Sequence, residues 1–118
     1  MEKTHKQLKA WIQAMLLVKM IYQITATYPR EELFSLTNQM RRAVASIPSN
    51  IAEGVARGST KEYVHFLNIA RGSLAELDTQ LEISKMLEYL PADHPVFNQI
   101  STTARLLTSL HKKMASLI

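Results

Sequence analysis

The sequence predicts an all-α protein: an antiparallel up-down-up-down four-helix bundle whose second helix is kinked or broken near Pro48. Apolar residues recur at spacings of three and four along almost the whole chain, which is the period of an amphipathic helix. Proline, serine and glycine interrupt this pattern and leave four segments with short connections, which favour antiparallel neighbours. No sustained alternation of apolar and polar residues and no Asn-Gly or Asp-Gly turn predicts a strand or a hairpin.

The first helix is predicted over residues 4–28, because apolar side chains such as Leu8, Met15 and Tyr22 return every three or four positions. Tyr28 precedes Pro29 and ends it, since the residue before a proline avoids helical dihedral angles. The apolar set is wider than one core-facing side requires and also includes Leu16, Leu17, Met20, Ile21 and Ile24. We expect part of this surplus to face another subunit.

Pro48 stands in the middle of the second helical pattern. Proline removes one backbone donor and clashes with the carbonyl four residues back, yet the apolar stripe continues on both sides of it. The nearby polar side chains of Ser46, Ser49 and Asn50 can hydrogen-bond the freed backbone groups. This combination predicts a kink or a short break in one long helix.

Capping residues indicate where the last three helices begin. Ser35 or Thr37 can cap the second helix, and Asp93 can cap the fourth. Ser59 and Glu62 form a capping box at the start of the third. The second helix is predicted to end at 54–58, the third at 89–91, and the fourth at the end of the sequence.

Gly72 lies inside the third helix, where glycine costs roughly 1 kcal/mol relative to alanine. Ala70, Ser73 and Ala75 lie beside it. The simplest interpretation is that a neighbouring helix approaches closely there.

Composition indicates one globular domain over residues 1–118. The chain is 47% hydrophobic and 20% charged, with no low-complexity tract, so it is long enough and apolar enough to bury one core. It has no cysteine, no signal-peptide pattern and no apolar run that could span a bilayer, which predicts a cytoplasmic protein without disulfides. The formal net charge of +4 favours weak attraction to polyanions.

Residues 36–84 closely resemble the 23S rRNA intervening-sequence proteins, also called the four helix bundle protein family. The family pattern is carried by Arg41, Arg42, Ser46, Pro48, Asn50, Glu53, Gly54, Gly72, Ser73 and Glu76. The order Val44-Ala45 departs from the pattern, which has Ala-Val. The resemblance covers the second and third helices, whereas the first and fourth match only in length and pattern.

The resemblance implies a small bacterial protein that folds as a four-helix bundle and assembles as a homopentamer, which would carry a charge of about +20. Some members are encoded within insertions in large-subunit ribosomal RNA genes. The family also resembles the accessory variability proteins of diversity-generating retroelements, which bind nucleic acid and a reverse transcriptase. By analogy of fold, this implies an alternative role as an interaction or scaffold module that docks a partner protein. The resemblance implies no catalytic residue.

Distributed basic charge is the strongest functional signal outside that segment. In an antiparallel bundle, the start of the first helix, the connection after the second and the end of the fourth lie at one end. The cations expected to converge there are Lys3, Lys6, Lys9, Arg57, Lys61, Lys112 and Lys113. They predict sequence-tolerant, salt-sensitive binding of RNA or DNA, with an ordinary solvated end as the alternative.

Other polar residues of the family pattern have structural and functional interpretations. Arg41 and Arg42 are either phosphate ligands or ion-pair partners of the acids in the same segment, which are Glu53, Glu62 and Glu76. Asn50, Glu53 and Arg57 share one helix face. They either stabilise the helix, with Glu53 and Arg57 as an ion pair, or form a polar pocket around Pro48.

Catalysis and metal binding are not predicted. The sequence shows no nucleophile with a base and no paired carboxylates, and residues 54–61 lack the ending of a phosphate-binding loop. The histidines at positions 5, 65, 94 and 111 lack the spacing of bundle metal sites. We expect His111 to be hydrogen-bonded in the core and His65 to be exposed or at an interface. We therefore expect a non-enzymatic protein without cofactor or metal.

Overall fold

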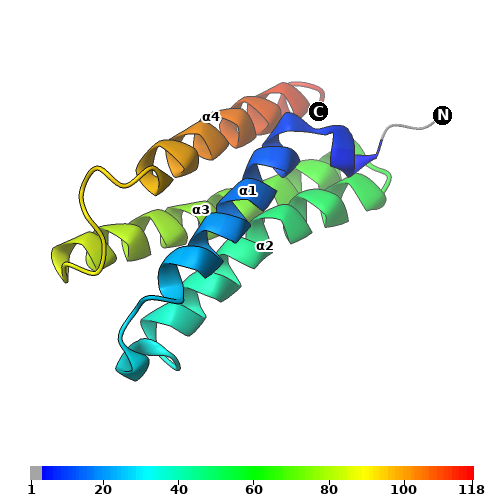
Figure 1. Cartoon of the computed structure of the whole chain (residues 1–118). Helices are drawn as coiled ribbons and strands as arrows, with labels where there is room; N and C mark the ends of the chain where they lie inside the picture. Colours follow the sequence, from blue (N-terminus) through cyan, green and yellow to red (C-terminus); the bar gives the residue numbers. More distant parts are fainter. Residues whose placement is uncertain (1–3) are drawn as a thin grey trace.

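Four α-helices make up most of the chain (Figure 1). The computed structural model describes residues 4–118. The helices are α1 (Lys9–Thr25), α2 (Leu36–Ala56), α3 (Thr60–Met86) and α4 (Val96–Ala115), and two short 3-10 helices are η1 (His5–Gln7) and η2 (Arg30–Glu32). Residues 4–118 contain no strand. The predicted all-α class with four helices is confirmed.

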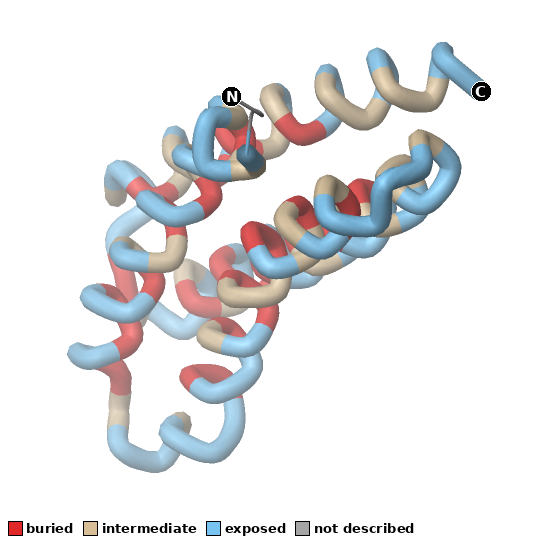
Figure 2. The backbone as a smooth tube through the Cα atoms, turned by 90° about the vertical axis from the view of Figure 1, so that its right-hand side faces the viewer, coloured by how far each residue is buried: buried red, intermediate tan, exposed pale blue. Residues whose placement is uncertain are grey.

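The helices pack around a shared core. Successive helices run in opposite directions (Figure 1), and α1 and α3 each contact both α2 and α4. Buried residues line the inward sides of the helices, and exposed ones cover the outside (Figure 2). The largest fully buried side chains include Leu17, Ile21, Met40, Ile47, Ile51, Leu67, Leu77, Leu81 and Leu107. All four helices therefore contribute to one apolar interior, as their periodicity predicts.

The N-terminal helix is shorter than predicted. Thr4 caps the separate turn η1 by accepting a hydrogen bond from the Lys6 amide at 3.2 Å. Leu8 then adopts an extended conformation, so α1 begins only at Lys9. At the other end α1 stops at Thr25, three residues before the predicted limit. The apolar spacing of three and four residues continues beyond both ends of α1. The helix nevertheless ends there, as the local hydrogen bonds show.

The helix α2 runs from Leu36 to Ala56 with Pro48 inside it, so it is not broken at the proline. Ser49 Oγ donates to the Ala45 carbonyl at 2.7 Å, and Asn50 Nδ2 donates to the Ser46 carbonyl at 2.8 Å. These side chains add hydrogen bonds to the turn before the proline, where the backbone ladder is disturbed. The predicted kink at Pro48 stays a prediction.

Capping differs among the three later helices. The Glu62 amide donates to Ser59 Oγ at 3.2 Å, so the predicted cap of α3 is confirmed, while the Glu62 carboxylate accepts from the Ser59 hydroxyl. Ser35 occupies the cap position of α2 without a side-chain hydrogen bond. The predicted cap by Asp93 is wrong: the Val96 amide donates to His94 Nδ1 at 3.0 Å. The helix α4 begins at Val96, and Pro95 occupies its N-cap position, so Asp93 lies too far before the helix to cap it.

The two helical glycines have different surroundings. A Cβ atom at Gly54 would lie 3.0 Å from both Phe66 Cβ and Tyr63 Cδ1, so this glycine lets α2 and α3 pack closely. At Gly72, no atom of residues 4–118 outside the adjoining helix backbone lies within 4 Å of the position where a Cβ would stand. The close approach of a helix that Gly72 predicts is therefore not made within this chain.

One face of α1 remains apolar and exposed. Ile12, Met15, Leu16 and Tyr22 are each 42–46% exposed, whereas Leu17, Ile21 and Ile24 are buried. Four large apolar side chains on one surface stripe of a helix form a contiguous patch rather than scattered single residues. We call these four residues the α1 stripe. Of the residues predicted as surplus, only Leu16 is exposed, Met20 is half-buried, and Leu17, Ile21 and Ile24 belong to the core, so the exposed apolar face consists mainly of other residues of the same helix.

Candidate nucleic-acid interface

The predicted basic residues of the described chain are exposed. Lys6 belongs to η1, Lys9 begins α1, Lys61 lies in the first turn of α3, and Lys112 and Lys113 lie in the last turn of α4. Lys3 lies outside the described residues. In Figure 1 the start of α1, the connection between α2 and α3, and the end of α4 share the right-hand half of the molecule. The bundle topology therefore brings distant parts of the sequence to one region.

Arg57 differs from the lysines because its charge is already partnered. Its guanidinium lies 2.9 Å from the Glu53 carboxylate and 4.0 Å from that of Glu62, and it stacks 4.9 Å above the Phe66 ring. The predicted ion pair of Glu53 and Arg57 is confirmed. Two carboxylates offset the arginine, so it contributes little net positive charge to this surface.

The five exposed lysines have no such partners. Within residues 4–118, the ion pairs join Arg57 to its two acids and Lys85 to Glu82. The lysines without a carboxylate partner there include Lys6, Lys9, Lys61, Lys112 and Lys113. We call these five the lysine set. An unpaired exposed ammonium group keeps its full charge for an anionic ligand.

The lysine set is spread along the bundle rather than gathered at a point. Gln99 Nε2 donates to the Gln13 carbonyl at 3.0 Å, so these two residues of α4 and α1 lie at the same position along the bundle. At 1.5 Å per residue, Lys112 then lies about 13 Å further along the bundle than Lys9.

A second contact places Lys61. Arg71 Nη1 lies 3.4 Å from His111 Nδ1, so these two residues of α3 and α4 lie at the same position along the bundle. By the same rise per residue, Lys61 lies about 13 Å beyond Lys112. The lysine set thus extends over about 27 Å. This corrects the expectation that the basic residues converge, because the helices start and end at different levels.

The arginines of the second helix do not pair as one prediction proposed. Arg41 Nε donates to Thr25 Oγ1 at 2.9 Å, and its guanidinium lies 4.9 Å above the Tyr22 ring. Arg42 is exposed, and neither arginine forms an ion pair within residues 4–118. The predicted pairing with Glu53, Glu62 or Glu76 is wrong. Arg41 faces the C-terminal end of α1, where the helix dipole favours a cation, far along α2 from Glu53.

Polar groups around Pro48 satisfy one another. Ser46 Oγ and Ser73 Oγ lie 2.8 Å apart and join α2 to α3, and Asn50 Nδ2 donates to Ser46 Oγ at 2.9 Å. Asn50 bonds within its own helix rather than with Glu53 or Arg57. Because these groups have partners in the chain, the contacts favour the structural interpretation over a binding pocket.

His111 lies half-buried on α4 beside Arg71. Burial of the ring and the nearby Arg71 charge lower the pKa of His111 below its ordinary value. Its Nε2 is buried without a hydrogen-bond partner, so only part of the predicted hydrogen bonding is present. His65 is exposed, as expected. The described residues hold no group of three or more metal-ligating side chains, and none of their helices is long and apolar enough to cross a bilayer.

Residues 6–110 match the model of a protein family described as 23S rRNA-intervening sequence protein. The chain belongs to this family. A search of curated proteins finds no match to the chain. As a 23S rRNA-intervening sequence protein, the chain matches its family over α1, α2, α3 and most of α4, a wider range than the resemblance at 36–84 indicated. Lys6, Lys9 and Lys61 lie within the matched range, whereas Lys112 and Lys113 follow it.

Proposed function

We propose that this 23S rRNA-intervening sequence protein is a non-enzymatic, oligomeric four-helix bundle that binds RNA or DNA with little sequence preference. The observation that carries the proposal is the lysine set: five exposed ammonium groups, spread over about 27 Å of the bundle, without a carboxylate partner in residues 4–118. Lysine is a point charge that contacts phosphate without reading bases.

The spread of the lysine set supports binding along a strand. A length of about 27 Å corresponds to about eight nucleotides at the 3.4 Å rise of one strand. Oligomerisation would strengthen the interaction, because each copy adds a formal net charge of +4. The family resemblance implies five copies, and a pentamer would present about +20 to a polyanion.

Salt dependence tests the proposal. Five phosphate contacts would release about four counterions, so the affinity for a structured RNA should fall about 100- to 500-fold between 50 and 200 mM salt. The measurement is fluorescence anisotropy of a labelled RNA and of its DNA equivalent. An affinity that does not change with salt would contradict the proposal.

A pair of variants locates the interface. Lys112→Gln with Lys113→Gln should weaken binding and reduce the slope of log affinity against log salt by about 1.4 to 1.8. The control, Arg30→Gln, removes one exposed cation outside the lysine set and is compared with Lys112→Gln alone. It should leave the slope close to that of the unmodified chain. Equal effects of these two single variants would show that net charge matters and the lysine set does not.

A second candidate function is docking of a partner protein, by fold analogy a reverse transcriptase. The observation that favours it is Phe34, which is 90% exposed beside the exposed Leu33 in the connection between α1 and α2. Phe34→Ser should then abolish co-purification with a protein that remains bound after nuclease treatment. Retention of that protein by the variant would contradict docking at this loop.

A further inference from the structure

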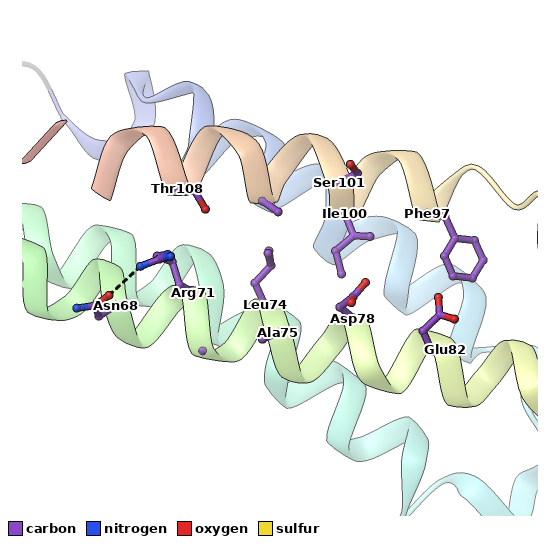
Figure 3. A pocket seen from close by; sticks show the side chains of 12 residues that line it. Asn68, Arg71, Leu74, Ala75, Asp78, Glu82, Phe97, Ile100, Ser101 and Thr108 are labelled. Atoms are coloured by element: carbon purple, nitrogen blue, oxygen red, sulfur yellow. Dashed lines mark hydrogen bonds between the residues drawn. The ribbon is translucent and has the colours of Figure 1, made fainter. Parts of the chain in front are cut away.

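A groove of about 710 Å³ runs between α3 and α4. Leu74 and Ile100 lie between the two helices, and Asp78 and Glu82 reach towards the groove from α3 opposite Phe97 on α4 (Figure 3). At Gly72 only the α3 backbone lines the groove, because this residue has no side chain. The groove therefore has an apolar base, Arg71 at its Gly72 end, and two carboxylates further along, of which Glu82 is paired with Lys85 and Asp78 is not.

Gly72 is exposed in the middle of α3. Among residues 4–118, no atom outside its own stretch of helix lies within 4 Å of the position of a Cβ. Glycine weakens a helix interior, whereas alanine would fit there freely. The open position leaves room for a group from outside the chain to approach the α3 backbone.

The same chain carries a surface that fits this groove. The α1 stripe is apolar, and Lys19 lies exposed in the middle of it without a carboxylate partner in residues 4–118. Asp78 likewise forms no ion pair there, and α1 contains no acidic residue. Apolar surface and charge are thus complementary between the stripe and the groove.

We propose that the α1 stripe of a second copy docks in the groove between α3 and α4, with its Lys19 against Asp78. In this register Ile12 covers Gly72, Met15 and Leu16 cover Ala75, and Tyr22 reaches Glu82 and Phe97. The spacing along α1 matches the spacing of these positions along α3, since both sets step by three and four residues.

The fold supports a parallel arrangement of the docked α1 and α3. These two helices run in the same direction within one copy (Figure 1), so a rotation about an axis along the bundle places the α1 of one copy parallel to the α3 of the next. Stripe and groove are different surfaces, which makes the contact head-to-tail, and such contacts form a ring when the rotation between successive copies closes. The inference rests on the oligomer of the proposed function and names its interface.

A charge exchange tests the contact. Lys19→Glu and Asp78→Lys should each raise the dissociation constant of self-association about tenfold or more, and the double variant should return to within about threefold of the unmodified chain. The measurement is sedimentation velocity over a range of protein concentrations. Arg42→Glu and Glu31→Lys are matched controls, because they reverse exposed charges away from the groove and should leave association unchanged.

Filling the groove gives an independent test. Gly72→Gln places a side chain where the chain has open space, so the variant should keep its helical circular dichroism and lose self-association. If self-association is unchanged in all of these variants, the proposed interface is wrong. The proposed RNA binding is tested separately by its salt dependence. An unmodified chain that stays monomeric at every concentration overturns both the interface and the oligomer.

Discussion

Replacing Gly54 by alanine is expected to destabilise the bundle, whereas the same replacement at Gly72 is expected to stabilise it. A Cβ at Gly54 would lie 3.0 Å from Phe66 Cβ, 3.0 Å from Tyr63 Cδ1 and 3.3 Å from the Tyr63 carbonyl oxygen. Phe66 Cβ is bonded directly to the α3 backbone, so relief of this contact requires the helices to move apart. At Gly72 the added methyl group meets nothing within 4 Å.

The magnitudes follow from two opposing terms. Alanine is favoured over glycine in a helix interior by about 1 kcal/mol, and this gain is similar at both sites. Overpacking at Gly54 costs about 1–3 kcal/mol, so its net change is a loss of about 0–2 kcal/mol. Gly72→Ala should gain about 0.5–1 kcal/mol, which for a chain of this size raises the Tm by about 2–5 °C.

The assay is urea unfolding followed by circular dichroism. Protein concentrations should be low enough for the midpoint not to depend on concentration, so that self-association does not add to stability. The free energy of unfolding of Gly72→Ala should exceed that of Gly54→Ala by about 1–3 kcal/mol. Equal shifts for the two variants would refute the steric role of Gly54 in bringing α2 against α3.

Two further predictions concern α3 and α4. Because the folded chain lowers the pKa of His111, it binds this proton less tightly than the unfolded chain, and stability should fall as the pH falls through about 6.5. His111→Gln should flatten this decrease in urea midpoint, and the exposed control His65→Gln should not; an unchanged pH profile of His111→Gln would contradict the assignment. Ser59→Ala removes the acceptor of the Glu62 amide and should cost about 0.5–2 kcal/mol of unfolding free energy, whereas Ser59→Asp keeps a capping oxygen and most of the stability. A loss in Ser59→Asp as large as that in Ser59→Ala would contradict a capping role.

Local signals predicted much of the fold. The capping pattern of Ser59 and Glu62 placed the start of α3 correctly, because the cap depends only on residues three apart. The ion pair of Glu53 with Arg57 followed from one turn of helix in the same way. Asp93 was a wrong prediction for α4, since both Asp93 and His94 are polar and only the course of the backbone decides which one reaches the Val96 amide.

The candidate interface was predictable in composition and not in shape. The lysines and the helices that carry them could be named from the sequence. The position of each helix along the bundle relative to the next depends on contacts such as Gln13 with Gln99 and Arg71 with His111. Arg41 illustrates the same limit. Its partner Thr25 lies on another helix, and nothing in the sequence distinguishes that neighbour from an acid.

Helical periodicity, caps and the family pattern are properties of neighbouring positions, and they were sufficient to establish four helices and the surplus of apolar residues on the first. Packing decided which of those apolar side chains stay exposed, which glycine meets another helix, and which cations keep free charge. The physical reason is that burial and charge pairing depend on distances between segments remote in the chain. Gly54 and Gly72 look alike in the sequence, and only their three-dimensional surroundings separate them.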